Sequence, residues 1–371
     1  MDERPIKPRS WYRNDAVHPM LKRAHAPEQC TLDADSASGV SDPWREGYGK
    51  VRVLESAGAG GLNDFTFGGG STGIAWSVNP YAGCAHACSY CYVPDTIKAE
   101  RRNWGSYVMV KRDLPTRLAK AMVDSPKMTV YLSTATDPYQ PAEAENRITR
   151  KCLEVLARKD WPVEVLTRSP LVLRDLDLLR QFSQVRVGFS IPTMDEEMRK
   201  VLEPSAPPIA ARLDALRKVS DEGISTFANY TPAAPPTTHT ADQIARTFLG
   251  AGAQWVNSKG LIRVETVIAT IWERLRNGPW EDLTRFYASG ARQAAWQQEL
   301  GAAFSKVGLP LSTPFFNPPF EFLLPQIAPG RVQATLDDQP RVAPLPMAIR
   351  DSEANDLFPI VVPAMAMRQR R

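Results

Sequence analysis

The sequence predicts an α/β fold built on a parallel sheet, and two observations support this prediction. Between residues 72 and 257, short β-prone segments alternate with amphipathic stretches of helical period. Polar residues also follow several of these segments directly, where the carboxyl ends of parallel strands collect the chemistry of such folds. Strands separated by helices are joined by right-handed crossovers, which place successive strands parallel to one another.

Strands and helices can be expected in order along this region. The strands are expected at residues 74–78, 128–133, 163–167, 185–191, 224–230 and 254–257. Between them we expect helices at 111–122, 145–158, 173–182, 209–219 and 241–250, the fourth ending at Gly223. In the second helix, Cys152 shares the apolar face of Ile148, Val155 and Leu156, so we interpret it as a core residue.

The flanking regions lack this alternation. Residues 1–70 are glycine-interrupted and are expected to form an irregular arm, while 71–260 form the alternating domain. Residues 261–308 carry two apolar helical stripes, and the proline-rich segment 309–371 is expected to be a covering segment or tail. Four tryptophans that resemble stacking platforms for bases are interpreted as core residues: Trp255, Trp272, Trp280 and Trp296.

Composition indicates an ordinary globular protein. The 371 residues are 43% hydrophobic, and the formal net charge is +4, which is compatible with nucleic acid but not a strong basic footprint. Arg101, Arg102 and the basic stretch 368–371 are interpreted as solvated surface. No apolar run reaches the roughly 20 residues that span a bilayer, and the first residues lack a signal-peptide core. We therefore expect a cytoplasmic protein without membrane contact.

Cys84, Cys88 and Cys91 lie within eight residues, separated by three residues and then by two. Three thiolates on one loop can bind a compact inorganic centre, but they are too few for a tetrahedral zinc or for every iron of a cubane cluster. Zinc would need a fourth ligand, and His86 within the same loop is cramped. A disulfide is disfavoured by the odd count of five cysteines. An iron–sulfur cluster with one open iron is the prediction.

The motif Cys-x3-Cys-x-aromatic-Cys, with Tyr90 as the aromatic residue, resembles the signature of radical S-adenosylmethionine (SAM) enzymes. Residues 79–84 and Tyr92 resemble the branch that contains spore photoproduct lyase and proteins described as DNA repair photolyases. Further matches lie at 131–141, 166–170, 173–177, 188–191 and 202–204, so the resemblance covers about residues 71–260. It implies a partial (β/α)6 TIM-like barrel, in agreement with the strand–helix pattern.

The resemblance also implies cofactors and roles. Cys84, Cys88 and Cys91 would bind a [4Fe-4S] cluster that cleaves SAM reductively, giving a 5′-deoxyadenosyl radical that abstracts hydrogen from a substrate. A reductant such as flavodoxin or ferredoxin would supply the electron. SAM-binding positions follow by matching: Tyr90 and the backbone of Tyr92 beside the adenine, Arg168 and Ser190 at the carboxylate, and Thr136 and Asp137 at the amino group.

The substrate stays open at this point. Spore photoproduct lyase has a hydrogen-returning cysteine at the place of Ala135, and Tyr131 or Tyr139 are the candidates to replace it here. A nucleic-acid lesion predicts a basic, aromatic-lined groove. A small metabolite or peptide predicts a closed pocket. The third hypothesis is a non-catalytic iron–sulfur protein, against which Arg168 and Ser190 argue because an electron carrier needs no carboxylate site.

Overall fold

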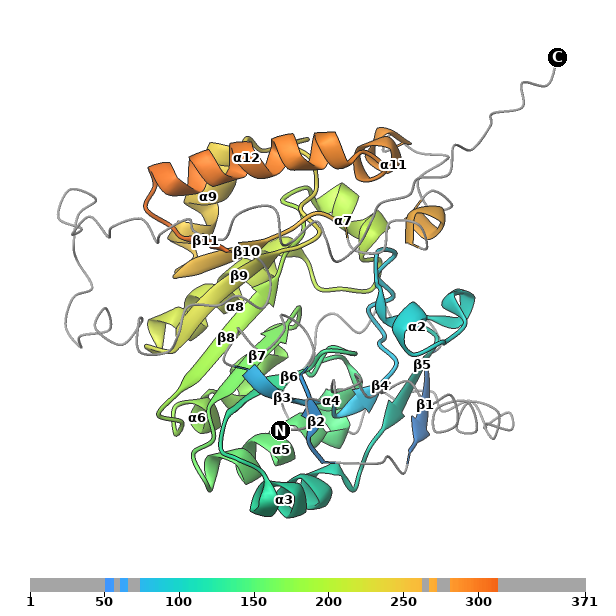
Figure 1. The fold of residues 1–371 in the computed structure, drawn as a ribbon, viewed down its shortest axis with the longest axis vertical. Helices are drawn as coiled ribbons and strands as arrows, with labels where there is room; N and C mark the ends of the chain where they lie inside the picture. Colours follow the sequence, from blue (N-terminus) through green and yellow to red (C-terminus); the bar gives the residue numbers. More distant parts are fainter. Residues whose placement is uncertain (1–50, 57–60, 66–73, 262–266, 272–280, 313–371) are drawn as a thin grey trace, which may run out of the picture. The chain divides into compact units, whose positions relative to one another are not determined.

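The computed structural model describes residues 51–56, 61–65, 74–261, 267–271 and 281–312, which all belong to the compact unit Met1–Pro329. Its main sheet has the strand order β11-β10-β9-β8-β7-β6-β3-β2 (Figure 1). The second unit, Gly330–Arg371, lies outside the described residues, as do Trp272 and Trp280. Of the apolar helical stripe predicted over residues 264–275, Val264 and Leu275 lie outside them as well, whereas 267–271 are helical.

Six strands of the main sheet are parallel and follow one another in chain order. They are β3 (Ile74–Val78), β6 (Thr129–Leu132), β7 (Val163–Thr167), β8 (Val185–Ser190), β9 (Ser225–Tyr230) and β10 (Trp255–Ser258). The short β11 (Leu311–Ser312) adds in parallel to β10, and β2 (Asn63–Asp64) adds antiparallel to β3. The predicted α/β class, with six parallel strands in the order of a partial barrel, is confirmed.

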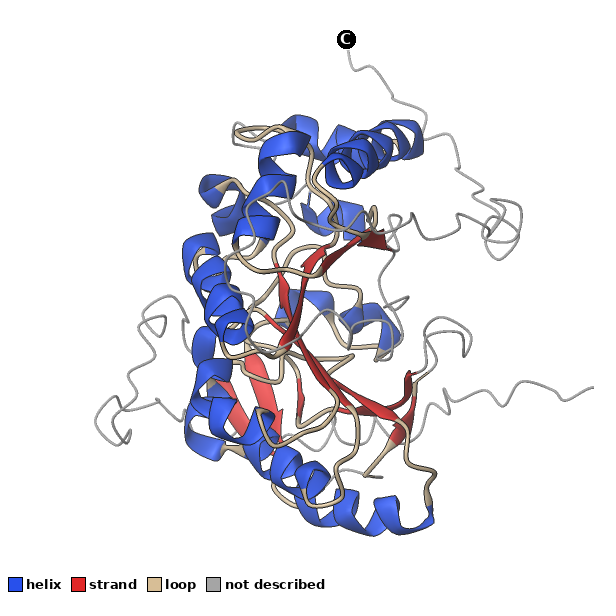
Figure 2. Cartoon of the chain, turned by 90° about the vertical axis from the view of Figure 1, so that its left-hand side faces the viewer, coloured by secondary structure: helices blue, strands red, loops and turns tan. Residues whose placement is uncertain are grey.

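Helices cover one face of the main sheet (Figure 2). The longer ones are α3 (Leu114–Asp124), α5 (Ile148–Ala157), α8 (Ile209–Asp221), α9 (Ala241–Gly250) and α12 (Gly290–Lys306). The shorter ones are α4 (Ala142–Asn146), η4 (Pro170–Asp175), α6 (Leu176–Leu179), α7 (Glu196–Leu202) and α11 (Glu281–Tyr287). Cys152 and Trp296 are buried in this packing, and Trp255 is buried in a separate cluster with Phe227, so all three are core residues as predicted. No helix among the described residues is long and apolar enough to cross a bilayer.

The helix predicted over 145–158 is two helices, and this is a difference with a physical reason. Arg147 has a left-handed backbone with φ of 52°, which ends α4 and precedes α5. The buried carboxylate of Glu143 accepts hydrogen bonds from the first backbone N–H groups of α5, those of Thr149 at 2.9 Å and Arg150 at 3.2 Å. A capping carboxylate one turn earlier therefore lets a new helix start directly after the old one.

A second, three-stranded sheet carries the cysteine loop. Its order is β1 (Arg52–Glu55), β5 (Tyr107–Val110) and β4 (Tyr81–Ala82), and β4 runs directly into the loop. The turn out of β4 requires glycine, because Gly83 has φ of 81° and a Cβ there would lie 2.5 Å from the Tyr107 carbonyl oxygen.

Part of the predicted irregular arm and of the predicted tail is regular. Strands β1 and β2 fall in the region 1–70, and β11 falls after residue 309, so both flanks add strands to the fold. The domain boundaries drawn at residues 70, 260 and 308 stay predictions.

Candidate active site

A pocket lies at the carboxyl ends of the parallel strands. It contains about 1100 Å³ of space not filled by atoms, open solvent included. All nine residues predicted from the sequence line it: Cys84, Cys88, Tyr90, Cys91, Tyr92, Thr136, Asp137, Arg168 and Ser190. They come from the cysteine loop and from the ends of β6, β7 and β8, so the fold brings four separate segments together.

The three cysteines are free thiols. Cys84 and Cys88 are buried, while Cys91 is partly exposed. Burial raises the pKa of all three thiols, that of Cys88 to about 12. A thiol in such surroundings keeps its proton at neutral pH unless a metal ion replaces that proton. The three thiols therefore suit a metal centre rather than a free nucleophile.

No three His, Cys, Asp or Glu side chains of the described ranges gather as ligands of a single metal ion. The thiolates of a cubane cluster bind different irons, so they need not converge on one point. The three cysteines around one pocket therefore fit a cluster.

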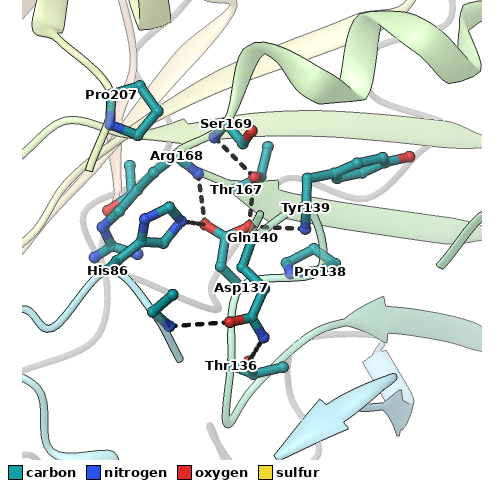
Figure 3. A network of polar contacts seen from close by, with 12 residues as sticks. His86, Thr136, Asp137, Pro138, Tyr139, Gln140, Thr167, Arg168, Ser169 and Pro207 are labelled. Atoms are coloured by element: carbon teal, nitrogen blue, oxygen red, sulfur yellow. Dashed lines mark hydrogen bonds and ion pairs between the residues drawn. The ribbon is translucent and has the colours of Figure 1, made fainter. Parts of the chain in front are cut away.

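Gln140 holds the start of the cysteine loop (Figure 3). Its side-chain oxygen accepts a hydrogen bond from the backbone N–H of Ala85 at 2.9 Å. Its side-chain nitrogen donates to the carbonyl of Gly83 at 3.3 Å and to the hydroxyl of Thr136 at 2.9 Å. The Thr136 hydroxyl in turn donates to the same Gly83 carbonyl at 2.6 Å. The segment after β6 thus fixes the backbone beside Cys84.

Asp137 joins four parts of the site. Its Oδ1 accepts hydrogen bonds from the Tyr139 N–H at 2.9 Å and the Thr167 hydroxyl at 2.6 Å. Its Oδ2 accepts from the Arg168 N–H at 2.8 Å and lies 3.2 Å from Nε2 of His86 (Figure 3). Burial opposes ionisation of Asp137, but His86, Arg168 and the hydrogen bonds outweigh it and lower its pKa to about 2.

These contacts give Asp137 a structural role beside the predicted one. Each of its oxygens already has two protein partners, so a bond to the amino group of SAM would be an additional contact. That assignment stays a prediction. His86, which lies between Cys84 and Cys88, also contacts the Ser205 carbonyl through Nδ1 at 3.2 Å. The imidazole thereby connects the cysteine loop to two further segments.

Arg168 lies in the pocket wall and is held by its side chain. Its Nε donates to Oε1 of Glu203 at 2.7 Å, and its Nη2 donates to the Tyr90 hydroxyl at 3.0 Å. The Tyr90 hydroxyl donates to the same Glu203 oxygen, and Arg212 donates to the other oxygen at 2.6 Å. Burial opposes the charge on Glu203, but Arg212 and Arg168 outweigh it and lower its pKa to about 2. Arg168 therefore stays a fixed cation beside the cysteines.

Ser190 presents an unused hydroxyl. Its side chain is buried, and its Oγ has no hydrogen-bond partner among the described residues. In the sheet register, Ser190 pairs with Asn229, and Asn229 pairs with Asn257, and all three line the pocket. A buried polar atom without a partner costs free energy unless a ligand or water satisfies it, which fits the predicted contact with a carboxylate.

Tyr92 is attached to the loop after β6. Its hydroxyl donates to the Thr134 carbonyl at 3.0 Å, and its backbone precedes α2 (Val93–Thr96). Tyr92 therefore lies between the cysteine loop and the carboxyl end of β6 and lines the pocket, while the contact of its backbone with the adenine stays a prediction.

Several contributors were missed by sequence reasoning: Gln140, Glu203, Arg212, Trp104, Glu164, Asn229 and Asn257. Glu203 lies in the segment 202–204, whose resemblance to the family was recognised without a role. Asn229 and Asn257 end strands that were predicted, so the position of a polar residue at a strand end was the available signal. Gln140 lies in the segment 131–141, which also resembles the family but suggested no role for it, whereas Arg212 acts through contacts across the fold and gave no local signal.

The family model of the Radical SAM superfamily matches residues 78–247, which include the cysteine loop and the strands β6, β7, β8 and β9. This match identifies a radical SAM domain in the chain. Members of this family are enzymes that use a [4Fe-4S] cluster and SAM.

The chain is similar to proteins that carry no functional description. It is 35% identical over 164 residues to an uncharacterized protein of Methanocaldococcus jannaschii, covering 44% of this chain and 62% of that one. It is 30% identical over 222 residues to an uncharacterized protein of the Acidianus two-tailed virus, covering 54% and 73%. An uncharacterized protein of Mycobacterium bovis is 31% identical over 198 residues, covering 50% and 58%. The match to the first of these relatives thus spans less than two thirds of its length.

Solved structures of similar fold include a spore photoproduct lyase variant with bound AdoMet and dinucleoside spore photoproduct. It has a TM-score of 0.48 and 16% identity, covering 66% of this chain and 72% of that one. Another is Streptococcus suis SuiB bound to the precursor peptide SuiA, with a TM-score of 0.44 and 12% identity, covering 89% and 66%.

Proposed function

We propose that this protein cleaves SAM reductively and uses the resulting 5′-deoxyadenosyl radical to abstract hydrogen from a substrate. The observation that carries the proposal is the convergence on one pocket of three thiols, a fixed cation and a hydroxyl that has no hydrogen-bond partner among the described residues. When bound, the cluster supplies one electron to SAM, which gives methionine and the radical, and the radical becomes 5′-deoxyadenosine on taking hydrogen from the substrate.

The chain's own residues would bind and orient the cluster and SAM. Cys84, Cys88 and Cys91 would hold the cluster, as three thiolates for its four irons. The guanidinium of Arg168 attracts the SAM carboxylate, for which its planar fork is suited, and Ser190 donates its hydroxyl to the same group. Tyr90 and the backbone of Tyr92 would flank the adenine. Thr136 and Asp137 lie on the side proposed for the amino group.

The substrate is proposed in two classes, a nucleic-acid lesion or a small metabolite or peptide. Ala135 packs beside Cys84 and Trp104, so the position that holds a cysteine in spore photoproduct lyase carries a methyl group here. This favours the metabolite or peptide class over DNA repair. If a side chain returns a hydrogen atom, Tyr131 is better placed than Tyr139, because Tyr131 lines the pocket and the Tyr139 hydroxyl bonds Asp175 at 3.1 Å.

The electron donor is proposed to be a flavodoxin or ferredoxin, which fits a cytoplasmic location for an oxygen-sensitive cluster. The cysteine nearest to solvent is Cys91, the one partly exposed member of the triad.

The test is anaerobic reconstitution with iron and sulfide, reduction with dithionite and addition of SAM. We expect 5′-deoxyadenosine by mass spectrometry with the wild type and none with Cys88→Ala. Cys152→Ala is the matched control, because Cys152 is equally a buried free thiol but lies in the helix layer. Cluster binding without any SAM cleavage, with several substrate classes present, would favour the non-catalytic iron–sulfur protein instead.

A further inference from the structure

Glu203 is a buried carboxylate in contact with both the cysteine loop and Arg168. We propose that Glu203 is a positioning residue for SAM and the cluster. It holds Arg168 by one edge of the guanidinium so that the other edge faces the SAM carboxylate, and it places a negative charge beside the Cys88 ligand. This inference rests on the function proposed above.

The contacts of Arg168 define which edge is held. Nε bonds Glu203 at 2.7 Å and Nη2 bonds Tyr90 at 3.0 Å, while Nη1 has no hydrogen bond within the described part of the chain. The guanidinium also lies over the Tyr90 ring, with Cζ 6.0 Å from the ring centroid. A flexible arginine side chain loses much rotamer freedom when a ligand fixes it, so fixing it beforehand makes ligand binding more favourable.

The backbone of the same segment is attached to the cysteine loop. Leu202, the last residue of α7, accepts hydrogen bonds through its carbonyl oxygen from the Ser89 N–H at 2.8 Å and the Ser89 hydroxyl at 3.2 Å. Ser89 lies between Cys88 and Tyr90. The position of Glu203 is therefore fixed relative to the cluster ligands by the backbone as well as by its side chain.

Glu203 lies between the Cys88 thiol and two positively charged arginine side chains. One carboxylate oxygen lies 4.0 Å from the Cys88 sulfur, and the two guanidinium groups of Arg168 and Arg212 flank it. Arg212 is fully buried and also donates to the Ser190 carbonyl at 2.9 Å. At short range inside a protein, a negative charge disfavours adding an electron to a nearby cluster, and a positive charge favours it.

Glu203 and Arg212 should therefore shift the cluster's reduction potential in opposite directions. We expect Glu203→Gln to raise the potential relative to wild type and Arg212→Gln to lower it, in redox titrations followed by electron paramagnetic resonance. The double variant E203Q/R212Q should lie above R212Q. It also avoids leaving the buried Arg212 without its carboxylate, should E203Q fold poorly. A purely structural Glu203 predicts no such opposed shifts, so an unchanged or lowered potential on removing Glu203 overturns this part.

SAM affinity separates positioning from simple competition. If Glu203 positions Arg168, E203Q/R212Q should bind SAM about tenfold more weakly than R212Q, which is the usual size of one lost charge-assisted bond. If Glu203 merely competes with SAM for Arg168, removing it should tighten binding, and that result overturns the proposal. Binding is measured from the SAM-induced change in the resonance spectrum of the reduced cluster, so no turnover is needed.

A measurement without the cluster distinguishes failure of this inference from failure of the proposed function. In the R212Q background, urea unfolding of Arg168→Gln, Glu203→Gln and both together forms a double-mutant cycle. Non-additive free energies of unfolding support the Arg168–Glu203 coupling even if the wild type bound no cluster, in which case only the proposed function would fail. Additive values overturn the positioning role.

Discussion

Replacing Gln140 by leucine tests whether the segment after β6 builds the cysteine site. Gln140 is fully buried, and both its side-chain oxygen and its side-chain nitrogen form hydrogen bonds with the cysteine loop. In Gln140→Leu the Ala85 N–H loses its acceptor, whereas the Gly83 carbonyl keeps the Thr136 hydroxyl at 2.6 Å. One buried donor is orphaned, so the free energy of unfolding should fall by about 1–3 kcal/mol.

The assay is urea unfolding before reconstitution, followed by iron retention under chelator challenge after it. Because the loop beside Cys84 loses a fixed backbone, the reconstituted variant should release iron faster than wild type. Gln181→Leu is the matched control, since the Gln181 amide bonds the Asp177 carbonyl at 3.1 Å on the surface and its loss should cost less than about 0.5 kcal/mol. Equal stability and equal iron retention in the two variants would refute the reasoning.

Three further outcomes are expected. Ser190→Ala should leave the free energy of unfolding within about 0.5 kcal/mol of wild type but weaken SAM binding about three- to tenfold, by calorimetric titration, because Ser190 Oγ has no partner among the described residues. Gly83→Ala should lower the free energy of unfolding by at least about 1 kcal/mol in urea, since its φ is 81° and its Cβ would meet Tyr107. Burial lowers the pKa of Lys111 to about 8, so the unfolded chain, with its pKa near 10.5, binds the extra proton between these values. Lys111 therefore contributes a rise in the free energy of unfolding over this pH range, while the buried thiols contribute a fall above pH 9 in both variants, so the difference between wild type and Lys111→Met should grow with pH.

The features that the sequence predicted are those with a local signature. The six parallel strands are runs of β-prone residues, and the apolar faces of α5 and α9 repeat with helical period. Parallel strands then place their carboxyl ends together without further information, which is why Thr136, Arg168 and Ser190 fall beside the cysteines.

The features that escaped prediction depend on packing between distant segments. Arg168 pairs with Glu203, 35 residues away, and the buried His86 pairs with Asp137. The start of α5 at Ile148 depends on the buried Glu143 carboxylate, and β5 pairs with β4 and β1 from separate parts of the chain. None of these partners is adjacent in sequence, so neither hydrophobic periodicity nor secondary-structure propensity predicts these contacts.

The attachment of the cysteine loop has a consequence for how the metal is delivered. Gln140, His86 and Ser89 hold the loop entirely through bonds between protein groups, unlike zinc fingers, whose metal provides the folding free energy. Iron and sulfide therefore bind to a loop whose backbone is already fixed. Deprotonation of the thiols opposes cluster assembly, because burial favours the protonated thiols and each must lose its proton to bind iron. Assembly of the centre should thus be faster in alkaline buffer, with Cys91, the partly exposed thiol, as the first to accept metal.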